Sequence, residues 1–382
     1  MKIKVGIVGL PNVGKSTLFN SLARQSIAQA ANFPFCTIEP NVAPIAVPDE
    51  HLDELGQLAG SRRTVSATME WLDIAGLAKG ASRGEGLGNK FLATVRECNA
   101  ILHVVRIFDD PDTIHVDGQV EPRLDAEAIN LELLLADLAH VERRLERTTC
   151  KGDEREALEA VAASLSAGKP ARSAGLSSQA GRAIKAMNLL TLKPVMYAFN
   201  VDEVDFLLAR DEARSRAAQV VASIEHADLA SDQFALVSAK LEAELASLHS
   251  RDEQLRHLCE LGLDDAQSAQ VLDGSLSYQV LPTMVRSLLG LSLVYTGPGV
   301  PPERSQTTRA HLFRAGQLTA LGLAGRIHGE IERGFIKAEV AGAATLLEHG
   351  SHSAAKDAGV IRTEGKEYEV ADGDVVLIRW ST

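Results

Sequence analysis

The residues from Gly9 to Ser16 have the types and spacing of a phosphate-binding loop. They read Gly-Leu-Pro-Asn-Val-Gly-Lys-Ser, with Thr17 directly after them. In such a loop, glycines let successive backbone N–H groups turn inward around a phosphate chain, and the following helix adds positive potential. The lysine reaches the β- and γ-phosphates of a nucleotide, and the serine hydroxyl coordinates Mg²⁺. We therefore expect a nucleotide to be bound by Asn12, Val13, Gly14, Lys15, Ser16 and Thr17.

A second pattern, Asp73-Ile-Ala-Gly76, closes a later apolar run. A carboxylate at the tip of a strand beside the phosphate loop can hold Mg²⁺ through water, and the Gly76 N–H can sense the γ-phosphate. Between the two motifs, the segment 32–41 supplies Thr37 as another hydroxyl ligand. Mg²⁺ is thus the expected cofactor, with Ser16, Thr37 and Asp73 as its predicted protein ligands.

Two further segments stand where GTP-binding proteins carry Asn-Lys-x-Asp and Ser-Ala-Lys. Ser238-Ala-Lys240 fits the second pattern, whereas in Asn200-Val-Asp-Glu203 a valine replaces the lysine and a glutamate the aspartate. Guanine is selected by a short carboxylate that accepts from two donors, and adenine lacks both of those donors. Because a lost paired polar contact costs much discrimination, we expect guanine selectivity to be poor, which makes adenine a plausible base. The predicted base contacts are Asn200, Val201, Glu203, Ser238 and Ala239.

Five short apolar runs must position these motifs. Each is rich in Val, Ile or Leu, and helical or loop segments separate them, which is typical of a parallel sheet covered by helices. The runs are Ile3–Gly9, Thr68–Asp73, Ala100–Phe108, Pro194–Asn200 and Phe234–Ser238. The fold class is therefore α/β.

The long gap between the third and fourth runs indicates an insertion. Leu131, Leu134, Leu138, Val141 and Leu145 follow spacings of three and four, and a second such series follows a turn near Lys151-Gly152. This pattern predicts a helical hairpin, as either a solvated spacer or a partner-binding arm. After the Pro/Gly-rich segment 296–302, short alternating strands around one helix indicate a small α+β domain.

The composition of the 382-residue chain is that of a soluble globular protein, with 45% hydrophobic and 24% charged residues. The net charge of −12 argues against a general nucleic-acid coat, which needs a basic surface. A membrane span is not expected, because no long uncharged apolar run occurs. Specific DNA binding is not expected either. The four scattered cysteines are interpreted as reduced thiols of a cytoplasmic protein.

Taken together, these motifs make the chain resemble the Obg-like ATPase (YchF) family of translation-factor-related P-loop GTPases. The resemblance rests on GLPNVGKST, NFPFCTIEPN, DIAGLAKGASRGEGLGN, NVDE, SAKLEAEL, RGFIKAEV and EGKEYEVADGDVV. It implies a Ras-like P-loop domain over residues 1–129 and 191–298, a helical insertion over 130–190, and a C-terminal ubiquitin-like (β-grasp, TGS) domain over 299–382. It also implies magnesium-dependent ATP hydrolysis with relaxed guanine selectivity, so we expect ATP to bind in preference to GTP. The implied partner is the ribosome, reached through the helical arm and the TGS domain. We expect a monomer.

The resemblance bears on catalysis too. Leu77 follows the Asp73–Gly76 motif where Ras-like enzymes place a water-orienting glutamine, so intrinsic hydrolysis should be slow or use another group. The family points to His115 as that group, acting with Lys15. Two alternatives remain open at this point. One is a GTPase of the same architecture, and the other is a nucleotide-dependent binding regulator whose hydrolysis has no role.

Overall fold

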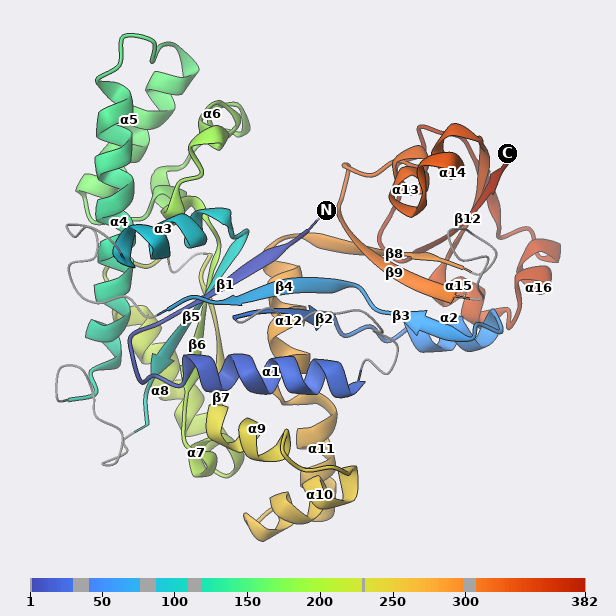
Figure 1. Cartoon of the computed structure of the whole chain (residues 1–382), viewed down its shortest axis with the longest axis horizontal. Helices are drawn as coiled ribbons and strands as arrows, with labels where there is room; N and C mark the ends of the chain where they lie inside the picture. Colours follow the sequence, from blue (N-terminus) through green and yellow to red (C-terminus); the bar gives the residue numbers. More distant parts are fainter. Residues whose placement is uncertain are drawn as a thin grey trace.

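The computed structural model describes residues 2–29, 41–75, 87–108, 119–228, 231–297 and 307–381. Within these ranges the chain forms two six-stranded sheets. A helical arm stands at one end of the long axis and the C-terminal domain lies at the other (Figure 1). None of the described helices is long and apolar enough to cross a membrane.

The first sheet carries the sequence motifs and has the order β2-β4-β1-β5-β6-β7. All neighbours pair in parallel except the edge strand β2, which is antiparallel to β4. Each of the five predicted runs forms a strand of this sheet. The strands are β1 (Lys4–Val8), β2 (Val42–Ala46), β4 (Thr68–Asp73), β5 (Ala100–Arg106), β6 (Val195–Asn200) and β7 (Gln233–Val237).

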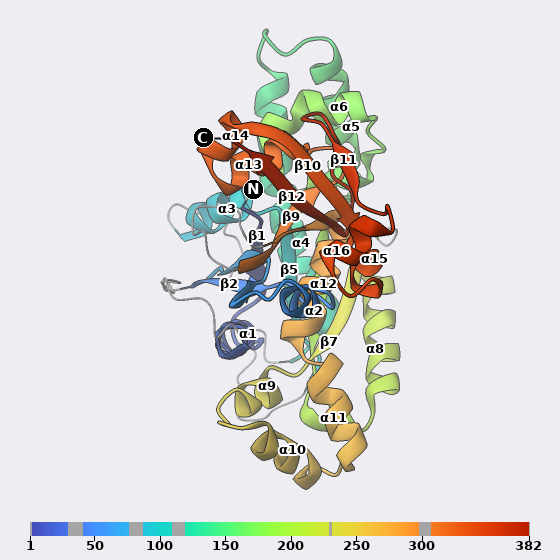
Figure 2. The same ribbon diagram turned by 90° about the vertical axis from the view of Figure 1, so that its right-hand side faces the viewer.

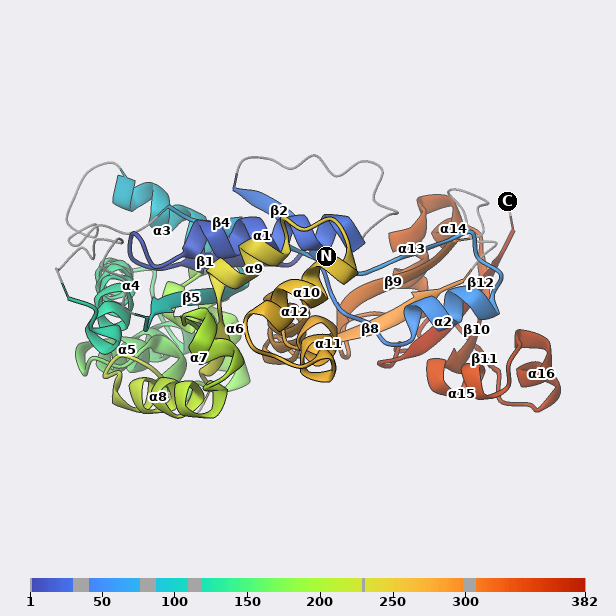
Figure 3. The same cartoon turned by 90° about the horizontal axis from the view of Figure 1, so that it is seen from below.

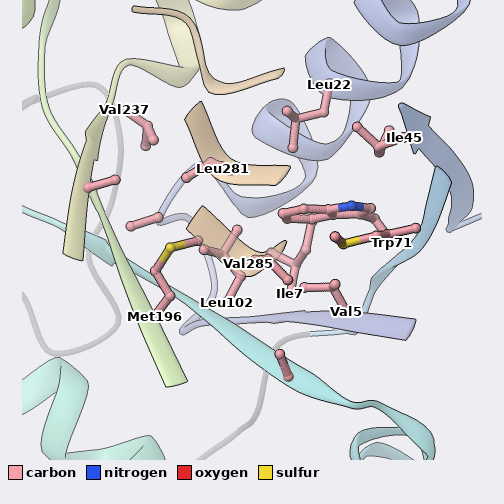
Figure 4. Close-up of a cluster of buried hydrophobic side chains, with 14 of the residues drawn as sticks. Val5, Ile7, Leu22, Ile45, Trp71, Leu102, Met196, Val237, Leu281 and Val285 are labelled. Carbon is pink, nitrogen blue, oxygen red and sulfur yellow. The ribbon is translucent and has the colours of Figure 1, made fainter. Parts of the chain in front are cut away.

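Helices cover both faces of this sheet. On one face, Leu22 of α1 (Lys15–Gln29) and Leu281 and Val285 of α12 (Ser277–Leu288) pack on strand side chains that include Val5 and Ile7 (Figure 4). On the other, α3 (Leu87–Glu97) contacts β1, and α4 (Pro122–Leu145) contacts β5 and α8 (Arg210–Ser223). Burying the strands on both faces explains their continuous apolar sequences.

Further helices follow β6 and β7: α7 (Glu203–Leu207), α9 (Ala239–Leu245), α10 (Arg251–Glu260) and α11 (Asp265–Gly274). Helix α2 (Leu52–Leu58), between β2 and β4 in the chain, lies against the C-terminal domain instead (Figure 1). Helix α9 packs beside α1 (Figure 3). The segment that follows β7 is thereby held next to the helix that follows β1.

The predicted helical hairpin is present, with α5 (Asp153–Ser166) returning along α4 after a turn that ends at Gly152, whose φ is +56°. The arm has its own core, which includes Leu134, Val141 and Leu158. Its return to the sheet runs through η1 (Ala171–Ala174), α6 (Ser178–Ile184), η2 (Lys185–Met187) and η3 (Leu190–Leu192).

Helix α4 begins at Pro122, ahead of the expected start of the insertion at residue 130. Its first half belongs to the main core, where Ile129 and Leu133 pack over the sheet. For that reason Leu131, which the spacing placed in the hairpin seam, is 40% exposed. The first half of α4 therefore packs on the sheet, and its second half packs in the core of the arm.

The second sheet has the order β11-β10-β12-β8-β9-β3. Its first and last C-terminal strands, β8 and β12, are parallel neighbours, and each has an antiparallel partner on its outer side, as in a β-grasp fold. The strands are β3 (Arg63–Val65), β8 (Leu291–Thr296), β9 (Thr307–Arg314), β10 (Phe335–Gly342), β11 (Arg362–Glu364) and β12 (Asp374–Trp380).

The C-terminal domain differs from the sequence-based expectation in two respects, its first strand and its number of helices. Strand β8 precedes residue 299 yet pairs with β9 and β12, so the C-terminal fold takes in a strand that the sequence placed in the nucleotide-binding domain. In place of the one expected helix, the described part of this domain has four, with α13 and α14 near one end of the long strands and α15 and α16 near the other (Figure 2). They are α13 (Ala320–Ile327), α14 (Gly329–Arg333), α15 (Ala343–Glu348) and α16 (His352–Asp357).

Candidate nucleotide-binding site

The phosphate-loop motif forms a strand–loop–helix unit. β1 ends at Val8 and α1 begins at Lys15, with the Leu18 N–H donating to the Gly14 carbonyl at 2.9 Å. Gly14 has a φ of +90°, which favours glycine. A Cβ on Gly9 would lie 2.7 Å from the Val104 carbonyl oxygen, so a side chain there would displace β5. Both glycines are therefore required by the geometry of the loop.

Lys15 lies against Asp73 across two neighbouring strands. Its Nζ is 3.1 Å from Asp73 Oδ1, and the two side chains are only 10% and 7% exposed. Parallel pairing of β1 with β4 brings them together, because Ile7 stands opposite Asp73. The lysine thus has an acidic partner in this state, and a triphosphate must replace that carboxylate as its counter-charge.

The surroundings of the Asp73 carboxylate indicate whether a Mg²⁺ ion fits this site. Asp73 Oδ1 is buried and accepts no hydrogen bond within the described part of the chain, despite its nearness to Lys15. A hard cation that keeps several waters suits such a carboxylate, and Ser16, which follows Lys15 at the exposed start of α1, offers a hydroxyl. Among the described residues no group of three or more His, Cys, Asp or Glu forms a metal site. A Mg²⁺ held mainly by the nucleotide, by water and by these two side chains is compatible with that finding.

Asn200 joins the phosphate loop to the segment after β7. Its Nδ2 donates to the Val13 carbonyl oxygen, and its Oδ1 accepts from the Ala239 N–H, both at 2.9 Å. The side chain is 3% exposed, and a Cβ on Gly14 would come within 2.3 Å of Nδ2. Both ends of this amide are therefore used within the protein, so Asn200 positions two binding loops.

A cavity of about 870 Å³ opens beside these loops. Seven of the predicted nucleotide-binding residues line it: Asn12, Gly14, Thr17, Asn200, Val201, Glu203 and Ala239. Four others do not line it: Val13 and Ser238 are buried beneath the loops, Lys15 faces Asp73, and Ser16 starts α1. Six lining residues were not predicted, namely Phe108, Asp202, Lys240, Ala243, Glu244 and Ser247.

Two of those additional residues had a signal in the sequence. Lys240 completes the Ser-Ala-Lys motif, and Phe108 is an aromatic residue just past the carboxyl end of a parallel strand, where ligands of α/β sheets bind. The guanidinium carbon of Arg106 lies 4.4 Å from the centre of the Phe108 ring. This cation–π contact helps to hold the Phe108 ring where it lines the cavity.

The base-facing motif differs in detail from the guanine-binding pattern. Glu203 Oε1 forms an ion pair with Lys240 Nζ at 2.9 Å, with side-chain exposures of 21% and 73%. Val201, in the lysine position, is 2% exposed, and its N–H donates to the Val237 carbonyl. The carboxylate in the aspartate position therefore already has a cationic partner.

A buried acid supports the helix that follows Ser-Ala-Lys. Burial raises the pKa of Glu242 to about 7, against hydrogen bonds from the Ser277 N–H and hydroxyl that lower it. Its Oε2 has no hydrogen-bond partner among the described residues. Glu242 thus connects α9 to the start of α12.

The other predicted site residues, Thr37, Gly76, Leu77 and His115, lie outside the described residues.

Comparisons with known proteins agree with this architecture. Residues 4–137 match a sequence-family model described as 50S ribosome-binding GTPase, and residues 304–381 match the YchF-GTPase C-terminal model, described as a protein of unknown function. The chain is 41% identical over 389 residues to the Ribosome-binding ATPase YchF of Bacillus subtilis, covering 100% of both chains. It is 37% identical to the Obg-like ATPase 1 of Oryza sativa subsp. japonica, covering 99% of this chain and 92% of that one.

A solved structure agrees over the same length. The Schizosaccharomyces pombe YchF GTPase superposes with a TM-score of 0.82 at 31% identity, covering 99% of this chain and 98% of the other. Both domains and the inserted arm therefore have counterparts in one relative. With full-length identity of this order and a matching fold, the chain belongs to the YchF family.

Proposed function

We propose that this protein is a Mg²⁺-dependent nucleoside-triphosphate hydrolase that binds ATP in preference to GTP and acts as a ribosome-associated regulatory switch. The names of its bacterial relatives, Ribosome-binding ATPase YchF, support the activity and the partner. The observation that carries the ATP preference is the ion pair between Glu203 and Lys240 at the base cavity.

Base selectivity follows from what that carboxylate can still accept. Guanine presents two donors and needs a carboxylate free to accept from both, whereas one Glu203 oxygen is already paired with Lys240. Adenine presents neither donor there, so the ion pair stays intact when adenine binds. Because guanine has to compete with Lys240 for that oxygen, guanine gains less from this site than from an Asn-Lys-x-Asp site.

The phosphate side of the site supplies charge and orientation. Lys15 exchanges Asp73 for the β- and γ-phosphates. Asp73, Ser16 and Thr37 would hold Mg²⁺, which when bound would supply positive charge to the transferred phosphoryl group. The Leu77 side chain can form no hydrogen bond with the attacking water, so we assign the orientation of that water to His115. Removing the His115 side chain should slow hydrolysis by at least about tenfold.

A GTPase of the same architecture is the second candidate. Glu203 still borders the base cavity with a carboxylate, and the S. pombe relative is titled a GTPase. In this case the ion pair with Lys240 would open when guanine enters.

The ion pair can be tested by removing its cation. Lys240→Ala frees Glu203 to accept from guanine, so the ratio of GTP affinity to ATP affinity should rise by about tenfold. Lys240→Arg keeps the pair and should leave the ratio unchanged. Titration of each variant with slowly hydrolysed ATP and GTP analogues measures it.

Two further variants sharpen the result. Adding Glu203→Ala to Lys240→Ala should return the ratio to the wild-type value, because no carboxylate remains. Glu203→Asp with Val201→Lys rebuilds the guanine-binding pattern and should favour GTP. A ratio that stays constant through the whole series would show that the selectivity does not reside in this pair.

A further inference from the structure

Arg106, the last residue of β5, is a charged side chain buried beside the nucleotide cavity. It is 1% exposed and does not itself line the cavity. Arginine is rarely buried to this degree, and replacing a buried charged group by an apolar one of similar volume is often neutral or stabilising. Stability alone therefore gives little reason for a guanidinium at this position.

The guanidinium group holds Phe108 through two different contacts. Its Nε donates to the Phe108 carbonyl oxygen at 3.0 Å, and its central carbon lies 4.4 Å from the centre of the Phe108 ring. The first contact fixes the backbone, and the second attracts the face of the ring. A lysine could not make both, because all of its donors are on the terminal ammonium group.

The backbone around Arg106 is tied to the base-facing motif. Arg106 stands opposite Asn200 in the register of β5 and β6, and the Ile107 N–H donates to the Asn200 carbonyl oxygen at 3.0 Å. The Asn200 side chain in turn holds the loops after β1 and β7. Phe108 is thus attached to a backbone whose position is fixed relative to the rest of the cavity lining.

Phe108 is the one aromatic side chain among the described residues that line the cavity. Nucleic-acid bases stack on aromatic rings, and the strength of this stacking depends little on which base is bound. A ring that is free to rotate has to be ordered when the ligand binds, and the lost side-chain freedom weakens binding. A ring already held by Arg106 avoids most of that cost.

We propose that Arg106 is a positioning residue for nucleotide binding: it holds the Phe108 ring in the orientation on which the purine base stacks. The inference rests on the proposed nucleotide site and adds a determinant of affinity that acts equally on ATP and GTP. The choice between the two bases stays with Glu203 and Lys240.

A double-mutant cycle tests whether Arg106 acts through Phe108. Wild type, Arg106→Met, Phe108→Ala and the double variant are each titrated, as the full chain, with slowly hydrolysed ATP and GTP analogues. Phe108→Ala should weaken both nucleotides by about tenfold and Arg106→Met by about fivefold, because a misplaced ring keeps only part of the stacking. The double variant should bind no more weakly than Phe108→Ala, since no ring is left to hold.

Additive losses, about fiftyfold in the double variant, would overturn the proposal, because Arg106 would then act by another route. Full ATP affinity in Arg106→Met would overturn it as well. If thermal melts show that Arg106→Met does not fold, Arg106→Lys takes its place in the cycle with the same expected pattern, because lysine cannot make both contacts.

A spectroscopic signal separates positioning from a general loss of stability. Etheno-ATP, a fluorescent adenine nucleotide, should be quenched at saturation on wild type by stacking on the ring, and less on Phe108→Ala and Arg106→Met. Equal emission from the three saturated complexes would contradict the positioning role. The control is Arg214→Met, which removes a cation–π contact of 5.3 Å to Phe234, outside the cavity lining, and should bind ATP like wild type.

The outcomes separate this role from the proposed nucleotide preference. Wild type that binds GTP more tightly than ATP would remove the proposed preference, while the cycle would still show whether Arg106 acts through Phe108. Wild type that prefers ATP with additive losses in the cycle would keep the preference and remove the role of Arg106.

Discussion

At the scale of single residues, the site is made of side chains that already have partners. Lys15 is paired with Asp73, Glu203 with Lys240, and both ends of the Asn200 amide are bonded to backbone. On the phosphate side, nucleotide binding is therefore an exchange of partners, because Lys15 leaves Asp73 for the phosphates. Both side chains of that pair are largely buried, so most of the cost of desolvating them has been met in the folded protein.

The buried acid Glu242 gives a pH-dependent prediction. Its pKa is raised to about 7 in the folded state, so between about pH 4.5 and 7 the folded chain binds more protons than the unfolded chain. Stability therefore falls as pH rises through this window, by up to about 3 kcal/mol. Glu242→Gln cannot ionise and should unfold at a midpoint that changes less between pH 5.5 and 8. Parallel thermal melts measure this, and identical pH dependence in both proteins would mean that Glu242 does not ionise in this range.

At the scale of elements, the amide of Asn200 links the carboxyl ends of β6 and β7 to the loop after β1. Asn200→Ala leaves the Val13 carbonyl and the Ala239 N–H without partners, at about 1 to 3 kcal/mol for each buried group. We expect lower stability together with at least about tenfold weaker ATP binding, because two binding loops lose their common anchor.

A second buried asparagine provides the control. Asn130 of α4 donates to the Tyr197 hydroxyl at 2.8 Å, and it does not line the nucleotide cavity. Asn130→Ala should lower stability by a similar amount and leave ATP affinity nearly unchanged. Calorimetric titration and chemical denaturation of both variants would test the distinction. Equal loss of ATP affinity in the two would mean that Asn200 acts only through general stability.

The sequence predicted the elements that obey a local rule. The buried strands appear as continuous apolar runs, the hairpin as leucines at helical spacing, and the phosphate loop as a glycine pattern with a fixed strand–loop–helix context. Local sequence patterns do not specify which distant segments pair with each other. β3 joins the C-terminal sheet beside β9, more than 240 residues away, and nothing in Arg63–Val65 specifies that neighbour.

The same limit applies within the site. The Lys240–Glu203 pair joins two motifs that were each recognisable, but their mutual distance depends on the neighbouring positions of β6 and β7. Helix α4 began earlier than expected for a related reason. Ile129, in the first half of this helix, packs in the main core against the sheet. A spacing rule for two helices that pack on each other does not take contacts with a sheet into account.

At the scale of the whole molecule, the C-terminal domain packs against the nucleotide-binding domain. Leu293, Tyr295 and Leu312 of its sheet belong to the main core, and the Tyr295 hydroxyl donates to Asp49 at 2.9 Å. Arg286 of α12 reaches Asp372 just before β12 at 3.2 Å. Through these contacts the C-terminal sheet packs directly on the domain that carries the nucleotide site (Figure 1).

The proposed function requires that the ribosome accelerates ATP hydrolysis by this protein. Single-turnover hydrolysis of ATP and of GTP, each with Mg²⁺ and each with and without ribosomes, measures this acceleration and the choice of nucleotide. We expect slow ATP hydrolysis by the protein alone, acceleration by ribosomes of at least about tenfold, and slower hydrolysis of GTP at equal concentration under both conditions. A preference for GTP above about tenfold, or an ATP rate that ribosomes leave unchanged, would contradict the proposed function.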